Sequence, residues 1–440
     1  MDLKKSALDI FSAALKAADP YEGIKRYVSI DDGTIVIDGH AYPESDYSRV
    51  IVVGAGKASP RMAQAIEDIL GDRIAEGWIN TKYGHAEPLS RIHVHECGHP
   101  VPDENGVIGA EHIIELVKSA DERTLVICLL SGGGSALAPA PVKEISLEEK
   151  QEVTRLLLNA GASIGELNAV RKHLSILKGG GMARLAAPAR LHVLILSDVV
   201  GDRLDTIASG PAVADESTFG DCLDICKRRH CYDSLPTGIR LRFQNGTQGR
   251  INETAKSGNV YLSTVVNTLV GNNRISVEAA ENRARELGFN TLLLSTVLEG
   301  EAAEVGTFFA AVASEIHASG NPIPPPACVL AGGETTVTVR GNGKGGRNQE
   351  MALSSAIALS GMRDVIFLSG GTDGTDGPTD AAGGIIDGGT VRYGKNEGFD
   401  AREYLSRNDS YAYLKKVDGL IITGPTGTNV MDVQILLLEK

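Results

Sequence analysis

A short apolar run that ends in glycines and leads directly into a segment with helical periodicity recurs along this chain. RVIVVGAGKAS at 49–59 is followed by MAQAIEDIL, and a second run, TLVICLLSGGGSA, occupies 124–136. A third run, LHVLILSDVVGD at 191–202, ends in carboxylates. Strands that are apolar along their whole length and alternate with helices are typical of a parallel sheet covered on both faces. The pattern therefore predicts an α/β fold.

The chain is long enough for two domains. It has 440 residues, and a single hydrophobic core rarely organises more than about 300. A polar, glycine-bearing stretch at 235–257 separates two series of strand and helix signals. We therefore predict a Rossmann-like N-terminal domain over 1–240, with a mainly parallel sheet, and a C-terminal α/β domain over 241–440. Each is expected to be a three-layer α/β/α structure.

Composition limits the partners of the chain. Its formal net charge is −13, and an acidic chain repels the phosphate backbone of nucleic acids. No apolar run reaches the roughly 18 residues of a membrane span. The N-terminus is expected to form an amphipathic helix without a cleavable signal. We therefore predict a cytoplasmic protein that binds neither nucleic acid nor membrane. The sequence leaves the oligomeric state open, with a homodimer as one candidate.

Cysteines and histidines gather at two places in the sequence. One segment contains Cys222, Cys226, His230 and Cys231, and the other contains His93, His95, Cys97 and His99. Zinc is one interpretation of the first segment, but buried thiols on a helix are favoured because no CxxC pair is present. The second segment alternates as a strand does, so ordinary strand packing is favoured over a transition-metal site.

The loop after the first strand has the composition of an anion-binding turn. It contains Gly54, Gly56, Lys57 and Ser59 and precedes a helix, whose N-terminus favours negative charge. A dinucleotide-binding turn is the alternative, but Ser59 replaces the third glycine, and no acidic residue ends the next apparent strand, GWINTK. Lys57 suits a phosphate, although a solvated surface lysine would look the same in the sequence.

A second glycine loop follows the strand at 124–130. Its residues are Ser131, Gly132, Gly133, Gly134 and Ser135. Successive N–H groups and two hydroxyls can form an anion-binding nest, and a flexible turn is the alternative. The segment resembles an esterase loop, but the nucleophile pattern GxSxG is absent there.

Charged residues then follow in two groups. NAVRKHLSILKGGG carries Asn168, Arg171, Lys172 and Lys178, which form either an exposed helix face or a clamp for a carboxylate or phosphate. Asp198 and Asp202 follow the strand at 191–196. Carboxylates at a strand end can bind Mg²⁺ or accept a hydroxyl proton, and a helix N-cap is the alternative for either one.

The second half of the chain also places charged residues after its strands. These residues are Glu334, Arg347, Asn348 and Glu350, followed by Asp373, Asp376 and Asp380 after VIFLSGG. Arg347 and Glu350 are one helical turn apart, which places a cation and a carboxylate near one loop. Three carboxylates within eight residues favour a metal site, with Asx turns as the alternative.

These motifs together resemble the glycerate 2-kinase family whose C-terminal half is called the MOFRL domain. The similarity runs almost end to end. In the first half it is carried by GAGKAS (54–59), GHPVPD (98–103), LSGGGSA (130–136), NAVRKHLSILKGG (168–180), SDVVGD (197–202) and SGP (209–211). In the second half it is carried by AGGETTVT (331–338), GKGGRNQE (343–350), GTDGTDGPTDAAG (371–383) and TGPTGTNVMD (423–432).

The resemblance implies two α/β domains with a cleft between them. It also implies ATP as phosphoryl donor, Mg²⁺ or another divalent cation, and D-glycerate as the acceptor that is phosphorylated at its 2-hydroxyl. Members of the family are often labelled hydroxypyruvate reductase. An NAD(P)H-linked reductase is one alternative for this chain, disfavoured by the missing strand-end acid, and a non-catalytic nucleotide-binding protein is another.

Within this resemblance we assign three sets of site residues. The catalytic residues are Lys57, Asp198 and Arg347. The residues that bind substrate or nucleotide are Gly54, Gly56, Ser59, His99, Ser131, Gly132, Gly133, Gly134, Ser135, Asn168, Arg171, Lys172, Asp202, Asn348, Thr372 and Asn429. The metal ligands are Glu334, Glu350 and Asp373. Asp198 and Arg347 are predicted to act on one phosphoryl group.

Overall fold

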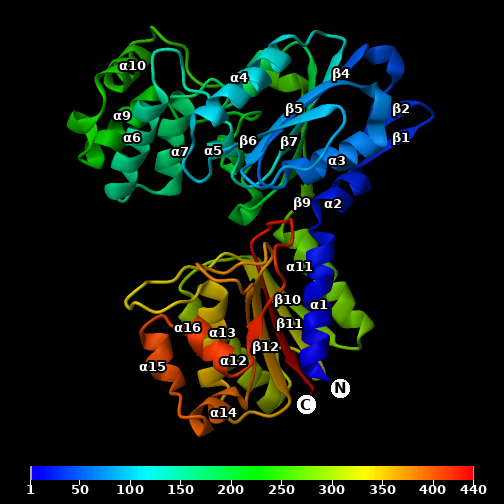
Figure 1. The fold of residues 1–440 in the computed structure, drawn as a ribbon, viewed down its shortest axis with the longest axis vertical. Coiled ribbons are helices and arrows are strands. Elements are labelled where there is room, and N and C mark those ends of the chain that lie inside the picture. Colours follow the sequence, from blue (N-terminus) through cyan, green and yellow to red (C-terminus); the bar gives the residue numbers. More distant parts are fainter. Residues whose placement is uncertain (1, 440) are drawn as a thin grey trace. The chain divides into compact units, whose positions relative to one another are not determined.

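The computed structural model describes residues 2–439, which form two compact units (Figure 1). The parallel-sheet unit comprises residues 20–197 and 202–270. The mixed-sheet unit comprises residues 2–19, 198–201 and 271–439. Each unit has its own sheet and core, and the chain passes from one unit to the other four times.

The predicted boundary between residues 240 and 241 falls inside a helix, α10 (Thr237–Thr247), so the compact units differ from the predicted domain ranges. The helix is hard to detect in the polar stretch at 235–257, because only Ile239, Phe243 and Gly246 face inwards. The N-terminal helix α1 (Leu3–Ala17) also differs from the prediction. It lies in the mixed-sheet unit, where Phe11 packs against Gly370.

The parallel-sheet unit is built on a six-stranded sheet. The strands, in spatial order, are β6 (Ile92–Cys97), β5 (Ile74–Lys82), β4 (Arg49–Ala55), β7 (Thr124–Leu130), β8 (Arg190–Leu196) and β9 (Val265–Gly271). The four ladders from β6 to β8 are parallel, as the sequence predicted. Strand order runs outward in both directions from the β4–β7 pair. This pair is therefore the topological switch point, where ligands bind in open parallel sheets.

Helices and a small antiparallel sheet complete this unit. The helices are α2 (Pro20–Tyr27), α3 (Ser59–Leu70), α4 (Glu104–Lys118), α5 (Gly134–Leu137), α6 (Leu147–Asn159), α7 (Ile164–His173), α8 (Gly181–Ala186), α9 (Phe219–Arg228) and α10. The small sheet contains β1 (Val28–Asp31), β2 (Thr34–Ile37) and β3 (His40–Tyr42). A separate core joins residues of α6, α7, α9 and α10, and it contains the thiols of Cys222, Cys226 and Cys231. The favoured interpretation of that cysteine cluster, buried thiols on a helix, is therefore confirmed.

The mixed-sheet unit has a six-stranded sheet of a different kind. Its strands, in spatial order, are β10 (Asn290–Leu298), β11 (Ala327–Gly333), β15 (Asp432–Leu438), β12 (Val365–Gly371), β13 (Gly383–Asp387) and β14 (Leu420–Ile421). Only β10 and β11 pair in parallel, and the other four ladders are antiparallel. The apolar runs of this half therefore indicate burial on both faces and not strand direction.

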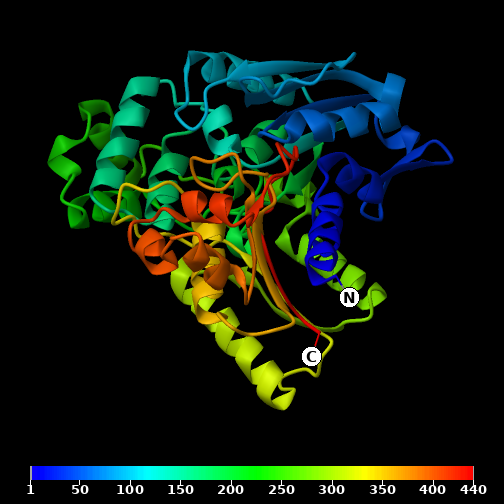
Figure 2. The ribbon, with the colours of Figure 1, turned by 60° about the horizontal axis from the view of Figure 1, so that its bottom comes forward.

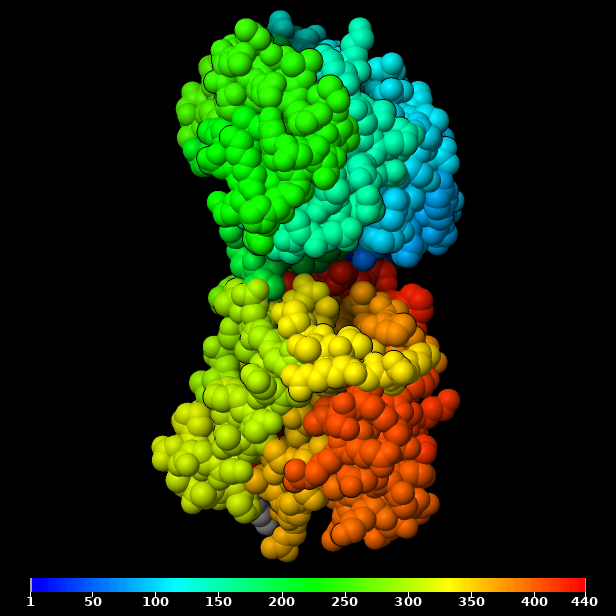
Figure 3. All heavy atoms as spheres, turned by 90° about the vertical axis from the view of Figure 1, so that its left-hand side faces the viewer, coloured from blue at the N-terminus to red at the C-terminus, as the bar shows by residue number. Residues whose placement is uncertain are grey.

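Helices cover both faces of the mixed sheet (Figure 2). One core lies under α1 and α11 (Asn273–Glu286). The other lies under α12 (Ala302–Ser319), α13 (Arg347–Ala358), α14 (Thr390–Asn396), α15 (Ala401–Ser406) and α16 (Ser410–Lys416). Figure 3 shows the loop that follows β11, in yellow, on the surface of this unit. No helix between residues 2 and 439 combines the length and apolarity needed to cross a bilayer.

We predict that Leu436→Ala destabilises the mixed-sheet unit by about 2–5 kcal/mol, the usual cost of truncating a buried leucine. Leu436 is fully buried in the central strand β15, between Val329 of β11 and Phe367 of β12. Hydrogen exchange should accelerate in β11, β12 and β15 and stay unchanged in β4 and β7. Val339→Ala, at a position that is 74% exposed, is the control. Equal effects of the two substitutions would contradict the prediction.

Candidate functional site

The loops that follow β4 and β7 meet at the switch point of the parallel sheet. The backbone N–H of Lys57 donates to the carbonyl of Gly132 at 2.9 Å, and the N–H of Ala58 donates to Ser131 Oγ at 3.0 Å. Gly56 has a φ of +153°, and a Cβ atom there would overlap Ser131. The two predicted anion-binding loops are therefore one structure, and Lys57 lies where they join.

Two serines that were predicted to bind a ligand form hydrogen bonds within this junction. Ser59 is fully buried, and its Oγ lies 3.2 Å from the carbonyl oxygen of Leu129 and 3.3 Å from Ser131 Oγ. Ser131 is only 1% exposed. Both serines hold the loops together, and their contact with a ligand stays a prediction. Gly54 is also buried, at the end of β4.

His99 lies beside the same junction. Gly133 has a φ of +84°, and a Cβ atom there would come within 2.8 Å of the His99 ring, so only glycine fits. Burial, assisted by the nearby charge of Lys57, lowers the pKa of His99 to about 4. The ring is therefore neutral at physiological pH, and Lys57 supplies positive charge at this point.

A directional chain of hydrogen bonds extends from the second loop. Lys178 Nζ donates to Ser135 Oγ at 2.7 Å and to the Ser135 carbonyl at 2.7 Å. Ser209 Oγ donates to Asn168 Oδ1 at 3.2 Å, which uses its one proton. The 2.9 Å bond between Ser135 Oγ and Ser209 Oγ must therefore be donated by Ser135. Ser135, which follows Gly134 in the first turn of α5, is thus fixed from both sides.

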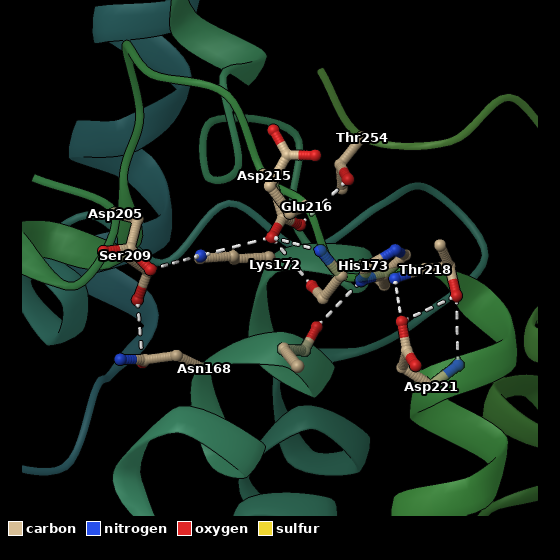
Figure 4. A network of polar contacts seen from close by, with 12 residues as sticks. Asn168, Lys172, His173, Asp205, Ser209, Asp215, Glu216, Thr218, Asp221 and Thr254 are labelled. Carbon is tan, nitrogen blue, oxygen red and sulfur yellow. Dashed lines mark hydrogen bonds and ion pairs between the residues drawn. The ribbon is translucent and has the colours of Figure 1, made fainter. Parts of the chain in front are cut away.

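Lys172 is already neutralised by the protein (Figure 4). Its Nζ lies 3.3 Å from Asp215 Oδ1 and 3.8 Å from Asp205 Oδ2. Burial acts to raise the pKa of Asp215, but the Lys172 charge and hydrogen bonds from Ser217 and Thr254 hold it below its ordinary value. Lys172, predicted as part of a clamp for substrate, instead ties α7 to the segment around residue 215.

Three other cations of this unit form a cluster that we call the basic cluster: Lys150, Arg171 and Lys178. Lys150 is 5% exposed, and its Nζ has no hydrogen-bond partner. Arg171 forms no ion pair and no hydrogen bond through its guanidinium with any residue between 2 and 439. Burial is the main cause that lowers the pKa of Lys178. The positive charges of Arg171 and Lys150 lower it further, so the three cations interact with one another.

Sequence reasoning missed Lys150. The segment LEEKQEV resembles a solvated helix, but Lys150 shares the buried face of α6 with Leu147, Val153 and Leu157. A lysine at an apolar position of the helical period was the signal that could have found it.

In the mixed-sheet unit, Arg347 is held by two carboxylates. Its Nε and Nη2 donate to Asp432 at 2.6 and 3.0 Å, and its Nη1 donates to Glu334 at 2.6 Å. Asp432 begins the central strand, opposite the ends of β11 and β12 at Gly333 and Gly371. Sequence reasoning quoted Asp432 in a motif but did not assign it a role.

Asp198 belongs to the same charged group. Burial raises the pKa of Glu334; the Arg347 charge opposes this, and the charges of Asp432 and Asp198 raise the pKa further. Asp198 therefore lies within electrostatic reach of the Glu334–Arg347 pair, in the same compact unit. Asp202 is assigned to the parallel-sheet unit, and its backbone has a φ of +53°.

A cavity of about 710 Å³ lies beside these residues. Its charged lining residues are Glu299, Glu334, Arg347, Glu350 and Asp376, and Val200 is one of its apolar lining residues. The loop residues Gly343, Gly345 and Gly346 present backbone to the same space. The cavity combines one cation with several carboxylates, a composition suited to a cationic or metal-bound ligand.

Two predicted ligand-binding residues of this unit instead support its framework. Asn348 is fully buried and accepts a 2.6 Å hydrogen bond from Ser369. Thr372 is also fully buried; it donates to the carbonyl of Met431 at 2.7 Å and accepts from the N–H of Val430 at 2.8 Å. These contacts fix the loops that position Arg347 and Asp432, and the binding of a ligand by either residue stays a prediction. Asn429 accepts from the N–H of Met431 at 3.1 Å in the same loop.

The three predicted metal ligands do not form one cluster. Glu334 binds Arg347, Glu350 accepts from Asn408 at 3.0 Å, and Asp373 accepts from the N–H of Thr375 at 3.0 Å. Within residues 2–439 no group of three or more His, Cys, Asp or Glu side chains is placed to hold a metal ion. Glu334 and Glu350 line the same cavity, whereas Asp373 is not among its lining residues.

Two protein families match this chain, one in each half. Residues 6–244 match the family model described as a domain of unknown function, DUF4147, and residues 327–432 match the MOFRL family. A "Glycerate 2-kinase" of Pyrococcus horikoshii is 44% identical over 100% of this chain and 98% of its own length. A "D-glycerate 2-kinase" of Thermotoga maritima is 46% identical over 99% and 98%.

One solved structure and one further relative extend this comparison. The crystal structure of a glycerate kinase from Thermotoga maritima has a TM-score of 0.90 with this chain at 45% identity, covering 99% of both. A relative from Agrobacterium vitis is named for hydroxypyruvate reductase and is 41% identical over 98% of this chain and 93% of its own.

We predict that stability depends on the protonation of Asp376, which caps the start of α13. Its carboxylate accepts the N–H groups of Asn348 and Gln349 at 3.1 and 2.8 Å, and burial raises its pKa to about 6. Because the folded pKa is higher than the unfolded one, this carboxyl contributes stability at low pH, which is lost as the pH rises through about 6. Relative to Asp376→Asn, the wild type should lose about 2 kcal/mol between pH 4 and pH 7.

Urea denaturation of both proteins, followed by circular dichroism across this pH range, measures the difference. Curves that stay parallel with pH would show that Asp376 does not titrate as expected.

Proposed function

The chain belongs to the glycerate 2-kinase family, and we propose that it transfers the γ-phosphoryl group of ATP to the 2-hydroxyl of D-glycerate. The products would be 2-phosphoglycerate and ADP. The observation that carries this proposal is the junction of the loops after β4 and β7, with Lys57 at the point where they join. Backbone N–H groups, a helix start and one cation at a switch point are suited to phosphate groups.

Phosphoryl transfer needs positioning and charge neutralisation more than covalent chemistry by the protein. In our proposal the Lys57 ammonium and the N–H groups of Gly132 and Gly133 bind phosphate oxygens, and the lysine stabilises the charge that grows during transfer. Asp198 orients the 2-hydroxyl of glycerate and accepts its proton. Arg347 presents a guanidinium fixed by Asp432 and Glu334, so it needs no reorganisation when the transferring group arrives.

Divalent metal is part of the proposal, and the carboxylates of the mixed-sheet unit fit it. Burial and neighbouring carboxylates raise the pKa of both Glu334 and Glu350, which indicates an excess of negative charge around one cavity. Mg²⁺ commonly takes one or two protein carboxylates together with substrate phosphates, so these two residues would hold it. When bound, it neutralises charge on the phosphate oxygens.

Hydride transfer from NAD(P)H is less well supported. A dinucleotide-binding fold places an acidic residue on the ribose at the end of the second strand. Here the strand that follows β4 and α3 is β5, and it ends at Lys82. A cytoplasmic location and a homodimer remain predictions from the sequence.

The reaction class can be tested on the purified protein. With Mg²⁺ present, we expect ATP consumption only when D-glycerate is added, and phosphorus NMR should identify 2-phosphoglycerate as the product. NADH oxidation with hydroxypyruvate, without glycerate-dependent ATP turnover, would overturn the proposal in favour of the reductase. Nucleotide binding without either reaction would favour a non-catalytic protein.

We predict that Lys57→Ala lowers kcat by on the order of 10²-fold, the usual effect of losing one electrostatic stabiliser of a transition state. Its urea denaturation should match that of the wild type, because Lys57 lies in a loop and is not part of either core. Lys118→Ala, an exposed lysine at the end of α4, is the matched control and should retain activity. Near-normal turnover by folded Lys57→Ala would remove Lys57 from the mechanism.

A further inference from the structure

We propose that Lys150, Arg171 and Lys178 form the subsite for the carboxylate of glycerate. This inference rests on the proposed function and assigns a role to Lys150, which the sequence analysis did not select. It identifies the part of the substrate that the basic cluster recognises, separately from the groups that handle phosphate.

Lys150 is the strongest sign of an absent anion. Its side chain lies on the buried face of α6, is 5% exposed, and has an Nζ atom without any hydrogen-bond partner. Burying an unpaired ammonium costs several kcal/mol, so proteins rarely retain one without a use. Burial, followed by the charge of Arg171, lowers its pKa to about 7. An anion would restore the charged form.

Arg171 and Lys178 lie within electrostatic reach of Lys150. Arg171, on α7, is half-buried and has no carboxylate partner, which leaves its planar fork available for a two-oxygen acceptor. Lys178 is 3% exposed and is held in place by Ser135. The neighbouring charges that shift the pKa values of Lys150 and Lys178 are all positive. The cluster therefore contains basic groups with no carboxylate of their own, and a bound anion would favour their charged forms.

Lys172 provides an internal comparison. It follows Arg171 directly in the sequence and is as buried as Lys150, yet it is paired with Asp215 and Asp205. The fold thus supplies carboxylates to the lysine that it needs as a structural tie. It supplies no carboxylate to Arg171 or to Lys150. In our proposal the presence or absence of a carboxylate partner distinguishes structural cations from ligand-binding ones.

A carboxylate fits the cluster better than a phosphoryl group. The charge of the glycerate carboxylate stays constant during phosphoryl transfer, so a buried and preorganised cluster can hold it throughout the reaction. The phosphate groups have another candidate position, at the Lys57 ammonium beside the loop that follows β7. The inference predicts an effect on glycerate affinity with little effect on ATP.

The test compares wild type with Lys150→Met and Lys150→Arg. For Lys150→Met we expect the KM for glycerate to rise by about 30-fold or more, the fold-change that corresponds to losing one partner of a buried charge pair. The KM for ATP should stay within about twofold. Because the substitution removes a buried unpaired cation, the temperature of unfolding should rise. Lys150→Arg should recover part of the glycerate affinity.

Calorimetry gives a readout that a structural role would not change. Titration of D-glycerate at pH 8 in two buffers of different ionisation enthalpy should show proton uptake by the wild type, because a bound carboxylate raises the lysine pKa values. Lys150→Met should take up fewer protons. Lys143→Met, an exposed lysine just before α6, is the control and should behave as the wild type.

The outcomes separate the two proposals. If the wild type shows glycerate-dependent turnover but Lys150→Met keeps its glycerate KM, the carboxylate subsite is wrong and the kinase proposal stands. A raised KM for ATP with an unchanged KM for glycerate assigns the cluster to the phosphates and also overturns the inference. If the wild type neither binds glycerate nor uses ATP with it, both proposals fall.

Discussion

The loops after β4 and β7 approach each other so closely that a side chain cannot fit at Gly56. The contact is closed by the hydroxyl of Ser131, which receives the N–H of Ala58, and by the bond from the Lys57 N–H to Gly132. These bonds set where α3 begins. Without them the backbone donors would have no common direction, and Lys57 would lie on a mobile loop. The parallel pairing of β4 with the fully buried strand β7 is therefore what gives the site its fixed frame.

In the mixed sheet, charged side chains fix the position of a site residue. Asp432 is fully buried at the start of the central strand, where an isolated carboxylate would be very costly. Arg347 meets it with two hydrogen bonds, and Glu334 takes the third arm of the guanidinium. Breaking a pair of this kind costs more than the pair contributes, because it leaves one buried charge alone. The arrangement therefore serves to hold a guanidinium in one orientation at a cavity wall.

Features that depend on the local sequence pattern, such as the positions of the strands, were predicted well. Apolar runs that end in glycines located β4, β7, β11 and β12, and a run that ends in carboxylates located β8. The residues after these strands lie near the described sites. Properties that depend on long-range contacts were not predictable. The apolar run VQILLL at 433–438 did not indicate that β15 would lie antiparallel between β11 and β12. A strand that is buried on both faces has the same composition whether it pairs in parallel or antiparallel. Similarly, α10 escaped detection because few of its side chains face a core.

Long-range contacts also decide the roles of the cations in NAVRKHLSILK, which the motif alone does not distinguish. Arg171 and Lys172 are neighbours of equal charge, and no local rule distinguishes them. Their difference lies in residues far along the chain: Asp205 and Asp215 neutralise Lys172, and no described carboxylate reaches Arg171. A buried cation with its own carboxylate is part of the framework, since the protein has already satisfied its charge. A buried cation without one, such as Lys150, either loses its proton or is neutralised by a charge from outside the chain, and we propose that the carboxylate of glycerate supplies that charge.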